Sequence, residues 1–115
     1  MPYIDGPKRT FTAGGAIAQY ARVKLSGSYT VIEAGAADTD IGTAETLVAS
    51  GEEVDVRLAN AQGTVYMIAG AAIAANASIY AAANGEISTV VSGPILGTAL
   101  EAATAAGDII EVLRT

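Results

Sequence analysis

The chain has no cysteine and no histidine among its 115 residues. Without cysteine, it can form neither a disulfide framework nor a thiolate metal site. Without histidine, it lacks the commonest general base and the commonest metal ligand. Aromatic side chains are also scarce, with one phenylalanine, five tyrosines and no tryptophan. These absences restrict any catalytic chemistry to carboxylates, hydroxyls and a few basic groups.

The sequence also has no long, uninterrupted apolar run. Its first residues contain no apolar leader core, so we expect no secretory signal peptide. The most apolar stretch, residues 65–83, is mostly alanine and is interrupted by Gly70, Asn76 and Ser78, which disfavours a membrane span. We therefore expect a soluble protein that is made in a cytoplasm and does not contact a membrane.

The net charge of −6 is unevenly distributed along the chain. Residues 1–24 carry four basic side chains and one acidic, whereas residues 25–115 carry two basic and eleven acidic side chains. An acidic body repels phosphate, so we expect no direct binding of nucleic acid. The basic N-terminal segment suits docking on an acidic protein surface, although ordinary solvated charges explain it equally well.

The most informative feature that is present is an internal repeat at an offset of 55–56 residues. Three pairs of segments carry it: residues 13–18 and 69–74, 41–44 and 96–99, and 51–56 and 107–112. Two copies are too few for a solenoid, which needs three or more units, but they suit one small closed domain. The sequence therefore predicts two repeats, about 13–59 and 69–115, in a single domain of residues 13–115 that follows an extended arm of residues 1–12.

Short strands separated by glycine-containing turns account for both copies. Apolar and polar residues alternate over residues 17–25, which is typical of a half-buried strand. Alanine favours a helix over residues 69–83, but the matching part of the first copy alternates like a strand. Asn84-Gly85 is a typical hairpin turn. About eight strands at this spacing predict an all-β barrel or sandwich, while a helical turn over residues 98–106 stays open.

The arm, residues 1–12, combines apolar anchors with two cations. Pro2 and Pro7 favour extended structure, and the segment is too short to bury its own apolar groups. The candidate contact residues of the arm are Tyr3, Ile4, Lys8, Arg9 and Phe11. Arg22 and Lys24, on the expected outward face of the first strand, extend the candidate contact surface. The alternative is that these two cations only balance nearby acids.

No catalytic constellation is evident in the sequence. Glu52, Glu53 and Asp55 suggest the paired carboxylates of a glycosidase, but their places at a turn and on an outward strand face favour solvated acids. Asp38, Asp40 and Glu45 offer oxygen ligands for Ca²⁺, but their spacing does not match a calcium-binding loop. We therefore expect no cofactor, no metal site and no catalytic residue.

The motifs follow one another in a distinctive order along residues 13–115. In chain order they are Gly14-Gly15, the strand at 21–25, IGTA at 41–44, SGEEVDV at 50–56, GTV at 63–65, Tyr80 before Asn84-Gly85, GTAL at 97–100 and AGDIIEVL at 106–113. In this order they resemble the small capsid decoration, or cement, proteins of tailed bacteriophages.

The resemblance implies a β-barrel head protein that binds the outer surface of the mature shell and has no enzymatic role. Its implied partner is the major capsid protein, whose neighbouring subunits it bridges to stabilise the shell. It also implies self-association, as a homotrimer or alternatively a homodimer, and a location on the outside of the virion after synthesis in the host cytoplasm. The alternative function is a small β-barrel module that binds a ligand or carbohydrate in a concave pocket.

Overall fold

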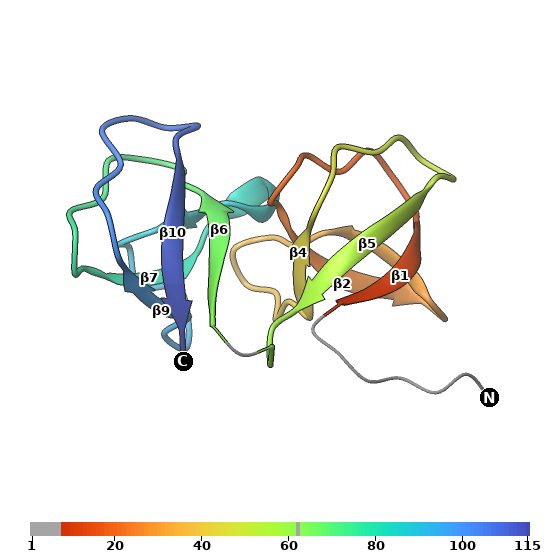
Figure 1. Cartoon of the computed structure of the whole chain (residues 1–115), viewed down its shortest axis with the longest axis horizontal. Coiled ribbons are helices and arrows are strands. Elements are labelled where there is room, and N and C mark those ends of the chain that lie inside the picture. The colour runs from red at the N-terminus through yellow and green to blue at the C-terminus, as the bar shows by residue number, and fades with distance from the viewer. Residues whose placement is uncertain (1–7, 62) are drawn as a thin grey trace.

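The computed structural model describes residues 8–61 and 63–115 as an all-β protein with two sheets (Figure 1). The first unit, residues 8–61, contains β1 (Lys8–Ala13), β2 (Arg22–Gly27), β3 (Thr30–Glu33), β4 (Gly42–Ala44) and β5 (Glu53–Leu58). The second unit, residues 63–115, contains β6 (Thr64–Ile68), β7 (Ser78–Ala81), the 3₁₀ turn η1 (Ala83–Gly85), β8 (Ile87–Ser88), β9 (Gly97–Ala99) and β10 (Ile109–Arg114). The predicted all-β class is confirmed.

The first unit is a closed barrel with the strand order β1-β3-β2-β4-β5. β1 closes it, because it pairs antiparallel with β5, from Lys8 opposite Arg57, and parallel with β3, at Ala13 opposite Val31. Closure pairs the edges of the sheet, which limits edge-to-edge association. Its interior is a cluster of buried apolar side chains that includes Phe11, Ile17, Val23, Val31, Val54 and Val56.

The second unit is a five-stranded sheet with the order β6-β10-β9-β7-β8. The sheet curls on itself, and a parallel bridge between Ala69 and Ile87 joins its two ends. It has its own buried cluster, which includes Met67, Ile73, Ile79, Ile87, Ile110 and Val112. The repeat predicts one barrel-like domain for residues 13–115, whereas the structure has two sheets with separate cores. Five short strands are enough for each unit to curl around its own apolar side chains.

The same backbone hydrogen bonds recur in the two units at the offset of the repeat. The N–H of Tyr20 donates to the Ala44 carbonyl, and the N–H of Asn76 donates to the Ala99 carbonyl, both at 2.7 Å. Isolated bridges likewise match, Ile17 with Val48 in the first unit and Ile73 with Ala103 in the second. These contacts recur at the predicted offset, while the two-repeat organisation itself stays a prediction.

The alternation over residues 17–25 does not form one strand. Ile17 makes an isolated bridge, the chain turns at Tyr20 with a φ of +67°, and β2 begins only at Arg22. Ile17, Ala21 and Val23 all lie in the core, as the alternation predicts. They do so on both sides of a turn, however, so the alternation does not indicate a continuous strand. The two strands on either side of the turn at residues 28–29 do pair, since β2 and β3 form an antiparallel hairpin.

The predicted arm is wrong for residues 8–12, which belong to β1. This strand pairs on both sides within the barrel, and Phe11 is part of the core. Phe11 is therefore not an anchor for another molecule. Tyr3 and Ile4 lie outside the described residues, so their predicted contact role stays a prediction.

Candidate functional site

A buried arginine joins the two units. Arg22, the first residue of β2, has 0% of its surface exposed although it carries a charge. Its Nε donates to the Glu86 carbonyl at 3.0 Å, and its Nη2 donates to the Ala82 carbonyl at 2.6 Å and the Gly35 carbonyl at 3.2 Å. Arg22 therefore spans from the first unit to the backbone of the second. Burial is the largest influence on its pKa and lowers it, while Asp40 opposes this shift.

Asp40 of the first unit binds Arg114, at the end of β10, with both carboxylate oxygens. The two N–O distances are 2.7 and 3.1 Å, a bidentate geometry that gives strong, directional pairing. Asp40 also lies 3.9 Å from Nη1 of Arg22 and is 7% exposed as a residue. We call Arg22, Asp40 and Arg114 the ionic lock, because one buried carboxylate compensates two cations across the joint.

The turn η1 completes the joint between the units. It comes from the second unit and lies against β2 of the first, where the N–H of Gly85 donates to the Ala34 carbonyl at 2.7 Å. A Cβ on Gly85 would fall 2.8 Å from the Cβ of Ala21, and the residue has a φ of +73°. Both constraints favour glycine at this position. Figure 1 shows η1 at the boundary of the two units, where it meets the first.

The expected outward position of Arg22 is wrong, because the second unit covers β2 at this residue. A guanidinium buried in the joint cannot contact a separate partner while the units stay together. Lys24 is partly exposed and pairs with Asp38 at 2.8 Å. Two hydrogen bonds lower the pKa of Asp38. The larger effect comes from Lys24 and the smaller from the N–H of Gly35. Lys24 thus pairs with a nearby acid, and its predicted contact role stays a prediction.

Arg9 and Phe11 both lie beside Tyr29 at one end of the barrel. The guanidinium of Arg9 lies 4.8 Å from the centre of the Tyr29 ring, within the range of a cation–π contact. The Phe11 and Tyr29 rings are 6.5 Å apart. Tyr29 is half exposed and has a φ of +53°, at the turn between β2 and β3. Arg9 is therefore held on the surface near this tip, well away from the joint.

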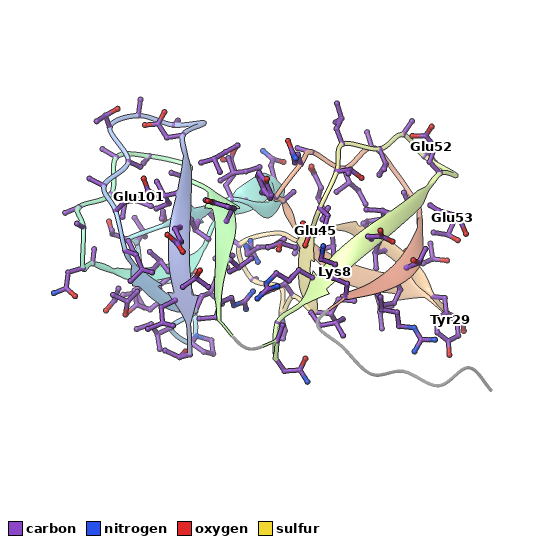
Figure 2. The ribbon with its side chains drawn as sticks, viewed as in Figure 1. Lys8, Tyr29, Glu45, Glu52, Glu53 and Glu101 are labelled. Carbon is purple, nitrogen blue, oxygen red and sulfur yellow. The ribbon has the colours of Figure 1, made fainter. Side chains whose placement is uncertain are left out.

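A crease between the two units collects aromatic and charged side chains. It is a hollow of about 240 Å³ whose lining includes Lys8, Tyr20, Glu45, Arg57 and Tyr66. The rings of Tyr20 and Tyr66 meet across it at 5.5 Å, and Lys8 pairs with Glu45 at 3.7 Å. Figure 2 shows Lys8 and Glu45 near the middle of the molecule, where the units adjoin. The crease therefore brings two aromatic rings together with charged side chains at the surface.

Metal-binding geometry is not found in the part of the chain that the structure describes. Residues 8–61 and 63–115 contain no group of three or more carboxylates placed to hold a metal ion. Glu52 and Glu53 lie exposed at a turn and at the start of β5. Asp38 and Asp40 instead pair with Lys24 and Arg114 respectively. Among the described residues, no helix is long and apolar enough to cross a membrane.

Sequence reasoning missed Arg114 and the roles of Asp40 and Tyr20. The signal was in the differences between the two repeats rather than in their agreement. At the repeat offset, Arg22 corresponds to Ser78, Asp40 to Ile95, Tyr20 to Asn76 and Arg114 to Leu58. Where the two copies contact each other, equivalent positions have different neighbours. Residues that form the joint are therefore expected to differ between the copies.

The described residues thus form two small β units, joined by a buried ionic lock, with a shallow crease between them. The chain belongs to the phage cement protein family, whose match covers residues 5–114. This confirms the resemblance to capsid decoration proteins. No curated protein matches the chain.

A solved structure shows the same fold in a phage head protein. The N base of head fiber gp8.5 of bacteriophage phi29 matches with a TM-score of 0.78 and 17% sequence identity. The match covers 94% of this chain and 92% of that chain, so it includes both units. Family and fold together support a structural protein of the phage head, and the family implies binding to the phage capsid.

Proposed function

We propose that this protein binds the outer surface of the mature phage head and bridges neighbouring major capsid subunits, which stabilises the shell. It is made in the host cytoplasm and joins the shell after assembly. Because it binds the assembled shell and not the free subunits, its binding energy adds to the stability of the assembled state. We expect a homotrimer, with a homodimer as the alternative.

The ionic lock is the observation that best supports bridging. A bridge must keep its two ends at a fixed separation when the subunits beneath it are pushed apart. The protein measures 42 × 26 × 22 Å along its principal axes, so its two units form an elongated body. Arg22, Asp40 and Arg114 fix one unit to the other through buried, charge-assisted contacts. A load on one unit is therefore passed to the other.

Co-sedimentation with undecorated, expanded shells tests this function. We expect the full chain to pellet with the shells and to saturate at a fixed number of copies per capsid subunit. A variant without residues 1–7 then tests the predicted contacts of Tyr3 and Ile4. The truncation must stop before Lys8, because removing β1 would open the barrel. Weaker pelleting of the truncated chain assigns affinity to the segment. Failure of the full chain to pellet with matched shells at micromolar concentration contradicts the proposed function.

The crease favours a second candidate, the ligand- or carbohydrate-binding module. Tyr20 has a φ of +67°, where a bulky residue is strained, whereas Asn76 occupies the matching turn at +71°. Asparagine tolerates this conformation much better than tyrosine. A tyrosine that is kept at a strained position beside Tyr66 and a lysine–glutamate pair suits stacking on a sugar ring.

Replacement of Tyr20 by asparagine tests this candidate without loss of the turn. We expect binding of a carbohydrate selected on a glycan array to weaken at least about tenfold, because one stacking surface is lost. The matched control is Tyr29→Asn, which makes the same change at another positive φ, far from the crease (Figure 2). Equal binding by Tyr20→Asn and the wild type, or no glycan bound by the wild type, rules out this function.

A further inference from the structure

The outer face of the second sheet exposes four apolar side chains around the carboxylate of Glu111. A second carboxylate, that of Glu101, accepts the N–H of Glu111 at 3.0 Å. Tyr66 on β6, Leu100 just after β9, and Ile109 and Leu113 on β10 each have 46–49% of their surface exposed. Tyr66 is directly opposite Glu111 in the β6–β10 pair, and the N–H of Leu100 donates to the Glu111 carbonyl. Ile109 and Leu113 flank Glu111 along β10 itself. These side chains therefore adjoin one another on one surface, which we call the apolar face.

The first unit is polar at every matching position. At the repeat offset, Tyr66, Leu100, Ile109 and Leu113 correspond to Thr10, Glu45, Glu53 and Arg57. The backbone pairing also matches. The N–H of Glu45 donates to the Asp55 carbonyl, as the N–H of Leu100 donates to the Glu111 carbonyl. The fold thus accepts hydroxyls and charges at these places and does not require apolar groups. Adjoining exposed apolar side chains mark a surface that another molecule covers.

We propose that the apolar face docks on an apolar patch of the assembled phage shell that carries a lysine or arginine opposite Glu111. This inference rests on the proposed function and names the surface that the second unit uses for it. The four apolar side chains lose exposed surface on docking, which supplies affinity. The central carboxylate then requires a cation, because burying it without one is costly. The capsid footprint therefore extends beyond the N-terminal segment.

The charges on the protein disfavour a second copy as the occupant. The second unit has four acidic side chains and one basic, Arg114, whose guanidinium binds Asp40 within the joint. Two apolar faces placed together would bring Glu111 against Glu111, and like charges across an interface repel. Placing the apolar face on the matching face of another copy's first unit would cover Glu53 and Asp55 with hydrocarbon. A partner with apolar groups and a cation suits both the four apolar side chains and the carboxylate of Glu111.

Pelleting with undecorated shells tests the proposal with a double variant, Ile109→Glu with Leu113→Arg. These substitutions introduce the residues that the first unit already has at the matching positions, so we expect folding, followed by circular dichroism, to be retained. We expect half-saturation of the shells to need at least about ten times more protein. The matched control, Glu53→Arg, changes charge on the corresponding face of the first unit and should bind like the wild type.

The charged part of the proposal has its own variant. Glu111→Gln keeps an oxygen that can accept the hydrogen bond from the Thr64 hydroxyl but removes the charge. We expect this variant to bind shells more weakly than the wild type and to lose affinity less steeply as salt is added. Equal salt dependence for Glu111→Gln and the wild type overturns the proposed cation opposite Glu111.

The outcomes separate this inference from the proposed function. If the wild type does not pellet, the proposed function fails and the inference fails with it. If the wild type and the double variant pellet equally, the inference alone is overturned and the footprint lies elsewhere. Sedimentation velocity in the absence of shells adds one further check. If the double variant loses an oligomer that the wild type forms but binds shells equally, the apolar face is a contact between copies and the inference is overturned.

Discussion

Replacement of Asp40 by alanine is expected to lower the free energy of unfolding by about 3–5 kcal/mol, the cost typical of breaking a buried ion pair from one side. The change leaves Arg22 and Arg114 facing each other in the joint without their shared carboxylate. A typical domain has only about 5–15 kcal/mol of stability in total, so the loss would be severe. Urea denaturation followed by circular dichroism measures it.

The control for this prediction lies two residues away. Asp38 also pairs with a cation, Lys24, but both side chains are partly solvated, and pairs of that kind contribute little. Asp38→Ala should therefore unfold at nearly the wild-type urea concentration. If Asp40→Ala and Asp38→Ala unfold at the same urea concentration, the ionic lock does not hold the two units together. The proposed bridging function then loses its structural basis.

Alanine at Gly42 or Gly97 is expected to destabilise the protein by at least about 3 kcal/mol, at the upper end of the range for overpacking. Gly42 on β4 lies so close to β5 that an added Cβ would clash with the Arg57 carbonyl oxygen. Gly97 on β9 has the same relation to the Leu113 carbonyl oxygen on β10. A backbone oxygen held in a sheet cannot move away as a side chain can. Thermal and urea unfolding of the two single variants provide the measurement.

Gly15→Ala is the matched control, because a Cβ at Gly15 meets no atom within 4 Å. Its stability should remain close to that of the wild type. Similar losses at Gly42 and Gly97 would show that the two repeats depend on the same close approach of strands. A large loss at only one of them would contradict the equivalence of the two units.

The fold class follows from the sequence because local pattern and backbone pairing agree in most strands. In β5, Val54 and Val56 point into the core while Asp55 and Glu53 point outward, as the alternation predicts. The Asn84-Gly85 turn likewise joins β7 and β8 into the expected hairpin. The number of units could not be predicted in this way. Periodicity shows which face of a strand is buried, but not whether two copies share one core.

The candidate site was harder to predict, since burial by the other unit leaves no periodic signal. Arg22 occupies an outward position of its strand, and only the packing of η1 and β10 against the first unit makes it internal. Phe11 lies outside the repeat and follows two prolines, a pattern that predicts an arm, yet its pairing with β5 places it in the core. The comparison of repeats, position by position, recovers part of what the pattern alone misses. It identifies the apolar face from polar-to-apolar changes.

The central claim, that this protein bridges capsid subunits, is tested most directly by a cryo-electron microscopy reconstruction of expanded shells decorated with the full chain. We predict density for both units on the outer surface, with contacts from each bound copy to at least two major capsid subunits. We also predict that the face of β6 and β10 is turned toward the shell. Density that touches a single subunit, or a bound copy with only its first unit against the shell, would contradict the account.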